Sequence, residues 1–405
     1  MNKTITIISL NYAPEDSAIG LYSSQMAEYL VENGWEVNVV TGFPYYPQWE
    51  IADEYKDKST WYSEKVNGVN VYRYKQFVPS NPKFSYRIIQ IIDFTLGSLF
   101  GLKRIKNSDV VLSIIPFTSS AWLGKILAKR LNAKHWVHIQ DFEFDAAFES
   151  GLTDDNGILK SLSKHLFNLE SRILDSATLV STISNGMLQK LKSKSRSETF
   201  FFPNWVDESF IDAKQSKKHP YLDSTKFKVL YSGNIGAKQD WELFKEVVVA
   251  FKDDQSIEFV VVGDGGMKIF VEELAKKTDN LSYYPPVPYA ELNDLLCATD
   301  IHVLFQKQDV IDTVMPSKLL GMFGSSKPSI ISGNKESEVA LVMKGVDIGV
   351  FVSDDLKTNV VQVIRTLQQN QNERLIMGVN ARNYVIENFS KITVLKRLQN
   401  KLDKL

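Results

Sequence analysis

Short runs rich in β-branched residues alternate along the chain with longer segments whose apolar positions recur at helical spacing. This alternation is typical of parallel sheets built from strand–helix–strand units. In the first half we expect strands at 4–10, 36–41, 69–74, 109–114, 135–140, 178–183 and 199–202. In the second half we expect them at 227–232, 257–263, 281–284, 301–305, 328–332 and 349–352, followed by helical sequence from 354 to 405.

The pattern predicts an α/β protein with two domains. It weakens after Pro203, and the polar stretch 212–225 has the composition of a linker between them. We expect one domain over 1–206 and a second over 207–384, with a C-terminal helix, about 385–405, packing back on the first. Each domain would be doubly wound and Rossmann-like. The two would face each other across a cleft, because such sheets bind ligands at the carboxyl ends of their strands.

The composition excludes several classes of protein. With 405 residues and 44% hydrophobic positions, the chain has enough apolar material for two cores. Its 47 basic and 48 acidic residues give no overall charge that would attract nucleic acid. The single cysteine, Cys297, lies in an apolar helical pattern and is expected to be buried. The first residues run into a strand without a leader pattern, so we expect a reducing, cytoplasmic location.

An apolar stretch at 88–102 is interrupted by Gln90 and Asp93 and is too short to span a bilayer. Basic residues flank it on both sides, namely Lys83, Arg87, Lys103, Arg104 and Lys106. This composition suits a helix that lies on the anionic inner face of a membrane, and it equally suits a core helix with solvated ends. A second basic run, at 190–196, is either solvated surface or a further part of such a face.

Three turns in the second half have the chemistry of anion binding. The first two contain glycines and the third begins a helix, so that backbone amides are exposed in each. A basic or polar side chain lies close to those amides in the sequence. The residues expected to bind the donor are Ser232, Gly233, Asn234, Lys238 and Gln239 in the first turn, Gly263, Asp264 and Gly265 in the second, and Ser317 and Lys318 in the third. One glycine-rich turn is weak support, but three in one domain favour a nucleoside diphosphate.

The order of these turns resembles the donor domain of the retaining GT-B glycosyltransferases of family four. The similar segments are 232–239, 261–265, 298–301, 315–319 and 326–328. In the first half, segments 11–14, 19–20, 43–47, 139–143, 184–187 and 202–207 extend the resemblance to the WcaI-like group of colanic-acid fucosyltransferases.

The resemblance implies a retaining, metal-independent glycosyltransferase of the hexosyltransferase type. It would move fucose or an amino sugar from a GDP- or UDP-linked donor, with no further cofactor. The acceptor would be a sugar linked to undecaprenyl diphosphate, or a polysaccharide, in the synthesis of a bacterial surface polysaccharide. Gly20 would approach the donor diphosphate from the opposite domain, and Lys238 would contact it.

The chain departs from the family pattern at two places. Asn234 stands where many relatives have arginine. A pair of glutamates found in many members is replaced by Thr313 and Gly321, so that its role would pass to backbone amides, to Asp309 or Asp312, or to nothing.

Candidate catalytic and acceptor residues lie at 138–145, at the carboxyl end of an expected strand. We expect Asp141 to orient the acceptor or sugar, with His138 or Glu143 as second choices, although His138 also fits a core histidine. The spacing of Asp141 and Glu143 is weak support for a glycosidase. The residues expected to act in catalysis are Asp141, Lys238 and His138, and those expected to contact the acceptor are Tyr45, Tyr46, Trp49 and Glu143. No set of histidines and acids has convincing metal-site spacing, so we expect no metal.

Two other functions remain compatible with the sequence. The missing glutamates suit a nucleotide-sugar-binding assembly protein without catalysis, which would bind a donor and transfer nothing. A sugar-nucleotide epimerase of the same architecture would convert its substrate with no acceptor present.

Overall fold

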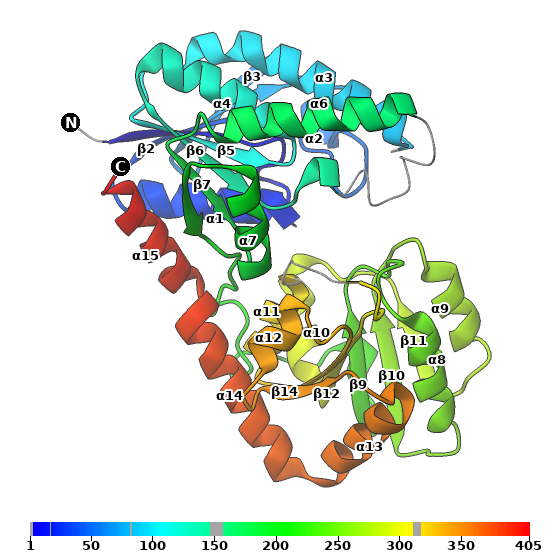
Figure 1. The fold of residues 1–405 in the computed structure, drawn as a ribbon. Coiled ribbons are helices and arrows are strands. Elements are labelled where there is room, and N and C mark those ends of the chain that lie inside the picture. The colour runs from blue at the N-terminus through cyan, green and yellow to red at the C-terminus, as the bar shows by residue number, and fades with distance from the viewer. Residues whose placement is uncertain (1–2, 17, 82, 146–156, 311–316) are drawn as a thin grey trace. The chain divides into compact units, whose positions relative to one another are not determined.

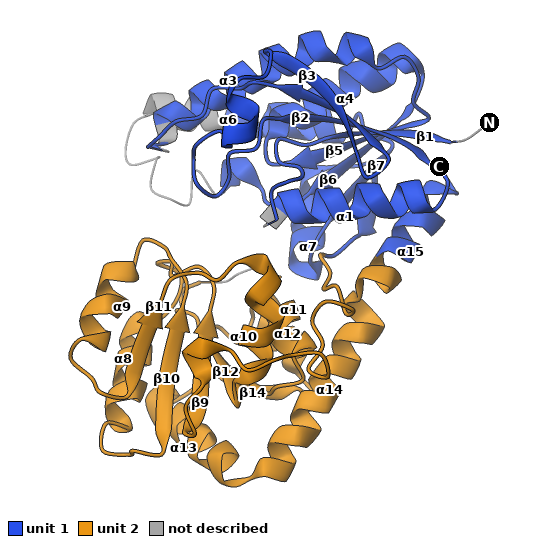
Figure 2. Ribbon diagram, turned by 180° about the vertical axis from the view of Figure 1, so that it is seen from behind, with its two compact units in different colours: residues 1–203, 395–405 blue, residues 204–394 orange. Residues whose placement is uncertain are grey.

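The computed structural model describes residues 3–16, 18–81, 83–145, 157–310 and 317–405. The chain forms two compact units, shown in Figure 2. Unit 1 comprises Met1–Pro203 together with Leu395–Leu405, and unit 2 comprises Asn204–Val394. The expected boundaries were after residue 206 and near residue 385. The last residues of the chain are part of the unit that contains its first residues.

The sheet of unit 1 has eight strands in the order β3-β4-β2-β1-β5-β6-β7-β8, parallel except for β3. The strands are β1 (Thr4–Ile8), β2 (Glu36–Gly42), β3 (Trp61–Val66), β4 (Val69–Tyr74), β5 (Val110–Ile115), β6 (Lys134–Ile139), β7 (Leu179–Thr182) and β8 (Glu198–Phe201). Strands β1 and β5 are buried along their whole length, as expected where helices cover both faces of a parallel sheet.

Strand β3 was not expected from the sequence. It pairs antiparallel with β4 through a two-residue turn, Asn67 and Gly68, whose φ angles are 48° and 84°. Two consecutive positive φ values define the turn type that matches the twist of a hairpin, and Asn-Gly is its preferred sequence. This dipeptide was the signal from which β3 could have been found.

Helices α3, α4 and α6 lie on one side of the unit 1 sheet and α1 and α7 on the other (Figure 1). The helices of this unit are α1 (Ala18–Glu32), α2 (Asp53–Lys56), α3 (Phe84–Gly101), η1 (Leu102–Arg104), α4 (Thr118–Leu131), α6 (Gly157–Leu174), α7 (Asn185–Lys194) and the end of α15 (Lys391–Leu402). Local chemistry sets their ends: the Ser184 hydroxyl accepts a hydrogen bond from Met187 N at the start of α7, and Asn132 ends α4 in the left-handed conformation.

Unit 2 is a second doubly wound sheet, with six parallel strands in the order β11-β10-β9-β12-β13-β14. The strands are β9 (Phe227–Ser232), β10 (Ile257–Val262), β11 (Leu281–Tyr284), β12 (Ile301–Phe305), β13 (Ser329–Ser332) and β14 (Gly349–Val352). The helices are η2 (Pro220–Leu222), α8 (Trp241–Ala250), α9 (Lys268–Ala275), η3 (Tyr289–Glu291), α10 (Leu292–Ala298), α11 (Ser317–Gly324), α12 (Glu338–Met343), α13 (Leu356–Gln369) and α14 (Gln371–Phe389). The strand order reverses between β9 and β12, the position at which such sheets bind ligands.

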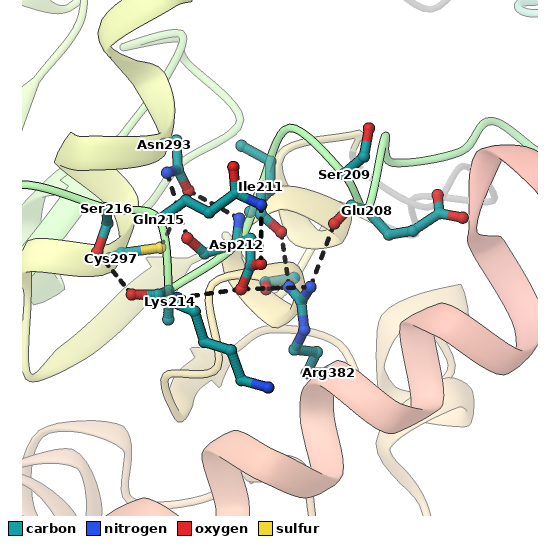
Figure 3. A network of polar contacts seen from close by, with 12 residues as sticks. Glu208, Ser209, Ile211, Asp212, Lys214, Gln215, Ser216, Asn293, Cys297 and Arg382 are labelled. Carbon is teal, nitrogen blue, oxygen red and sulfur yellow. Dashed lines mark hydrogen bonds and ion pairs between the residues drawn. The ribbon is translucent and has the colours of Figure 1, made fainter.

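The segment expected as a linker, 212–225, belongs to unit 2, and the residues before it are tied to α14. The Arg382 guanidinium donates hydrogen bonds to the carbonyls of Glu208, Ile211 and Gly324, at 3.2, 2.6 and 2.6 Å (Figure 3). It also pairs with Asp212 at 3.7 Å. The Arg382 side chain thus satisfies three backbone carbonyls that have no partner in a regular helix or strand. These hydrogen bonds fix the irregular segment against α14.

Figure 3 also shows Cys297 in α10, whose thiol lies 3.3 Å from Asn293 Oδ1. The residue is buried, and burial raises the pKa of its thiol to about 11. Cys297 is therefore a packing residue, as expected. Within the described residues, no helix is both long enough and apolar enough to cross a bilayer.

Candidate functional site

Two turns of unit 2 are joined by backbone hydrogen bonds at the carboxyl ends of β9 and β10. Ile235 N donates to Asp264 O at 2.8 Å, and Met267 N donates to Ile235 O at 2.9 Å. A Cβ atom at Gly263 would lie 1.9 Å from Gly233 O. The backbones of the two turns are therefore so close at this point that only glycine fits. The first and second predicted anion turns therefore form one surface.

The third turn reaches this surface through Lys318, in the first turn of α11. Its ammonium donates a hydrogen bond to Tyr231 Oη at 2.8 Å and lies over the ring, 4.5 Å from the centroid. A Cβ at Gly233 would lie 3.3 Å from Lys318 Nζ, so the side chain runs along the glycine. Tyr231 Oη in turn donates to Asn234 O at 2.5 Å. Tyr231 thus links the first turn to the lysine of the third.

The Lys318 side chain is partly buried. Burial lowers the pKa of its amine to about 8. In the part of the chain that the structure describes, no carboxylate lies within ion-pair distance of it. A partly buried cation without a counter-charge is unfavourable, and a bound anion would relieve the cost. The geometry therefore presents a cation beside closely packed backbone.

Other expected donor residues stabilise the turns. Gln239 Oε1 accepts a hydrogen bond from Gly236 N at 3.0 Å, and Asp264 Oδ1 accepts one from Gly265 N at 2.8 Å. Lys238, also in the first turn, is exposed, and its backbone carbonyl accepts a hydrogen bond from Lys307 N at 3.0 Å. The first two side chains set the loop shape, and Lys238 remains accessible from solvent.

The amino terminus of α8, which follows the first turn, is capped within the chain. Asp240 Oδ1 accepts a hydrogen bond from Leu243 N at 3.0 Å, so a carboxylate already caps this helix.

Ser232 ends β9, and Ser317 begins α11. Of the two positions that the resemblance assigns to a glutamate pair, Thr313 lies outside the described residues, as does nearby Asp312. Gly321 lies in α11, where a Cβ would be 3.1 Å from Leu296 Cδ1.

In unit 1, a buried carboxylate holds the aromatic loop expected to contact the acceptor. Glu15 accepts hydrogen bonds from Tyr45 N at 2.8 Å, Tyr46 N at 2.9 Å and Asn11 Nδ2 at 2.8 Å. Burial raises the pKa of this carboxyl group, against the effect of these donors. A Cβ at Gly20 would lie 2.8 Å from Glu15 Cβ, so the glycine makes room for the carboxylate. Sequence reasoning missed Glu15, since no motif marks it.

A cavity of about 340 Å³ opens between the loop after β1 and the aromatic loop. Tyr45 and Tyr46 line it, and Trp49 stands edge-on to both rings at 5.5 and 6.3 Å. Its lining also includes the acids Glu15, Asp16, Glu50 and Asp53 and contains no basic residue. Aromatic faces with carboxylate acceptors suit the hydroxyl groups of a neutral sugar better than a phosphate.

The residues at 138–145 take different positions. His138 is buried, with its ring nitrogens 2.9 Å from Ser181 Oγ and 3.1 Å from Gln140 Nε2, and burial lowers the pKa of its imidazole to about 3. Glu143 accepts a hydrogen bond from Thr118 N at 2.7 Å, and burial raises the pKa of its carboxyl group.

His138 therefore has the surroundings of a core histidine. Glu143 holds the start of α4, whereas Asp141 is exposed. Among the residues described, no group of three or more His, Cys, Asp or Glu side chains is arranged to hold a metal ion.

Comparison with known proteins gives consistent matches. Residues 17–205 match the family described as Glycosyl transferase 4-like domain. The chain is 32% identical over 350 residues to WcaI of Escherichia coli, which is assigned to colanic acid biosynthesis as a glycosyl transferase. The match covers 83% of this chain and 84% of WcaI.

Solved structures share the fold. Sucrose-phosphate synthase of Thermosynechococcus elongatus superposes with a TM-score of 0.74 at 14% identity, over 99% of this chain and 98% of that one. HepE of Anabaena, in complex with UDP-glucose, superposes with a TM-score of 0.67 at 10% identity, over 99% of this chain and 100% of that one.

Proposed function

This chain belongs to the glycosyltransferase family of WcaI and has the GT-B fold, and from that premise we propose that it builds a bacterial surface polysaccharide. It transfers a sugar, fucose or an amino sugar, from a GDP- or UDP-linked donor to a lipid-linked or polysaccharide acceptor, with retention of configuration. The observation that carries this proposal is Lys318, a partly buried cation beside the two joined glycine turns of unit 2.

The donor diphosphate would lie against Gly233 and Lys318. During transfer the bond from the anomeric carbon to the diphosphate breaks, and the diphosphate leaves with additional negative charge. Lys318 and the amides of the turns would stabilise that charge as it develops, which is worth most where water is excluded. Lys238, exposed in the first turn, would add a second positive charge.

The acceptor would bind to unit 1. Its sugar would stack on Tyr46 and Trp49, with its hydroxyl groups directed to the carboxylates of the cavity beside them. Asp141, exposed after β6, is our choice to orient the attacking hydroxyl, which forms the new bond to the anomeric carbon. The proton of that hydroxyl would pass to an oxygen of the departing diphosphate. A lipid-linked acceptor would be met at a bilayer surface.

The test begins with thermal unfolding of the purified protein in the presence of UDP, GDP and their sugar conjugates. A ligand at a hundred times its dissociation constant stabilises the folded state by about 2.7 kcal/mol, so the true nucleotide raises the melting temperature. The donor so identified is then incubated with and without an acceptor, here a polyprenyl-diphosphate sugar. We expect a new glycoside only when the acceptor is present.

Two results would reject the proposal. Conversion of the donor to an epimer without acceptor would make the protein an epimerase. The donor could also bind without being turned over, whichever lipid-linked or polysaccharide acceptor is added. That result would make the chain a nucleotide-sugar-binding assembly protein.

A further inference from the structure

Helix α3 exposes an apolar face to solvent. Ile89, Ile92, Leu96 and Phe100 are 49%, 54%, 53% and 60% exposed, and their spacing of three or four residues places them on one stripe. The opposite face of the helix is buried, with Phe94 at 0% and Ser98 at 1%. The apolar residues of an ordinary surface helix face the core, so a stripe this large facing outward indicates an interaction site.

The neighbouring helix α4 packs beside α3 on the same side of the sheet (Figure 1), and it also exposes apolar and basic side chains. Trp122 is 37% exposed, and Lys125 and Lys129 follow at helical spacing on the exposed side. Tryptophan has an apolar ring and a polar N–H, and lysine has an apolar stem below its charge. Both are typical of the boundary between lipid tails and water.

The charge of this region is strongly asymmetric, although the whole chain has a net charge of −1. Residues 83–131 contain eight basic side chains: Lys83, Arg87, Lys103, Arg104, Lys106, Lys125, Lys129 and Arg130. The same segment contains two acids, Asp93 and Asp109. Asp93 accepts hydrogen bonds from Tyr74 Oη at 2.9 Å and Phe77 N at 2.6 Å, and Asp109 accepts one from Thr4 N at 2.7 Å. Both carboxylates are therefore engaged with the sheet side of the unit.

The other basic run of unit 1 is compensated. Lys190 and Lys194 each pair with Asp145 at 2.7 Å, and Lys194 also pairs with Glu170 at 2.6 Å. Arg196 pairs with Asp175 at 3.0 Å. These cations are neutralised locally, so the run at 190–196 does not supply the uncompensated charge found around α3 and α4.

We propose that the outer face of α3 and α4 docks on an anionic lipid bilayer, with the α3 stripe inserted among the lipid headgroups and acyl chains. A second copy of this chain fits the face less well, because a two-fold contact would bring the basic residues of one copy against those of the other. This inference adds a lipid bilayer as a partner to the proposed function. It rests on the proposed function only for the idea that the acceptor is lipid-linked, because the surface of α3 and α4 does not include the donor site.

The experiment is co-sedimentation of the full chain with vesicles of phosphatidylcholine alone and of phosphatidylcholine mixed with phosphatidylglycerol. We expect binding to the anionic vesicles only, falling roughly tenfold or more from low to high salt as the charges are screened. The double variant Ile92→Ser/Leu96→Ser should lose most of this binding. A matched control, Ile269→Ser/Leu341→Ser, removes residues that are 73% and 58% exposed in unit 2 and should bind as the parent does.

Nucleoside-diphosphate affinity, measured on the same samples, separates this inference from the proposed function. A circular dichroism spectrum and a melting temperature close to those of the parent show that unit 1 of the α3 variant is folded. Equal binding of the variant and the parent to anionic vesicles, or equal binding to neutral and anionic vesicles, would overturn the proposal. So would an oligomer that forms without lipid and dissociates in the α3 variant, because the face would then belong to a second copy.

Discussion

Replacing Lys318 with methionine should stabilise the protein and weaken nucleoside-diphosphate binding at the same time. Burial lowers the pKa of the amine from 10.5 to about 8. At about 1.4 kcal/mol per pKa unit, the folded state carries a penalty of at most on the order of 3 kcal/mol at neutral pH. Methionine loses one hydrogen bond and the ammonium over the Tyr231 ring, each worth about 1 kcal/mol. The net gain should be about 1 kcal/mol.

The gain should depend on pH in a defined direction. Below pH 8 the lysine is protonated in both the folded and the unfolded chain, and the folded state carries the full penalty. Between pH 8 and 10.5 the unfolded chain retains the proton that the folded chain has lost, so the parent's stability rises with pH relative to the variant's. The advantage of Lys318→Met should therefore be largest at pH 7 and fade as pH approaches 10.5.

The measurement is urea unfolding of parent and variant at several pH values between about 7 and 10. The control is Lys245→Met, because the Lys245 side chain is 48% exposed and its loss should change stability by no more than about 0.5 kcal/mol. Calorimetric titration at pH 7 with the nucleoside diphosphate should show an affinity reduced about tenfold or more, the value of a charge-assisted hydrogen bond.

Two results would refute this reasoning. A variant less stable than the parent at pH 7, or a stability difference independent of pH, would show that burial of the Lys318 amine does not reduce the stability of the folded state. Unchanged nucleotide affinity would remove Lys318 from the site.

Two further predictions concern the same unit. Gly263→Ala places a Cβ where Gly233 O lies 1.9 Å away, so the joined turns must separate. We expect a loss of about 1 to 3 kcal/mol of stability and of nucleotide binding, measured by thermal unfolding and calorimetry; Gly266→Ala, with no atom within 4 Å of its Cβ, should leave both unchanged. Glycosyl transfer should survive EDTA, because lysines and backbone amides supply the positive charge at the donor site; loss of activity that magnesium or manganese restores would show a metal requirement.

The sequence predicted the architecture well because strand and helix periodicities are local. The segments 227–232, 281–284, 301–305 and 349–352 have the same bounds in the sequence analysis and in the structure. Strand β3 was missed because it is a polar edge strand. Its outward positions Trp61, Ser63 and Lys65 are exposed, so it lacks the apolar run that marks a buried strand. Only the Asn-Gly turn after it indicated a hairpin.

The candidate site was predictable only in part. The glycine turns could be located because a strand, a glycine pair and a helix are contiguous; their binding of a diphosphate stays a prediction. Tyr231 and Glu15 could not be found, because their positions depend on distant partners: Lys318 is 87 residues from Tyr231, and Tyr45 is 30 residues from Glu15. Such contacts follow from how the loops converge at one edge of a sheet, which no local pattern contains.

The return of residues 395–405 to unit 1 has a consequence for biosynthesis. Leu395, Leu398 and Leu402 are buried, and Asp403 pairs with Lys3 at 2.8 Å at the opposite end of the chain. After residue 203 has been synthesised, the ribosome needs on the order of 10 to 40 s to translate residues 204–394, at about 5–20 residues per second. Throughout that interval the nascent first unit lacks the part of α15 whose leucines are buried in the finished protein. The unit that is translated first is therefore the last to complete its core.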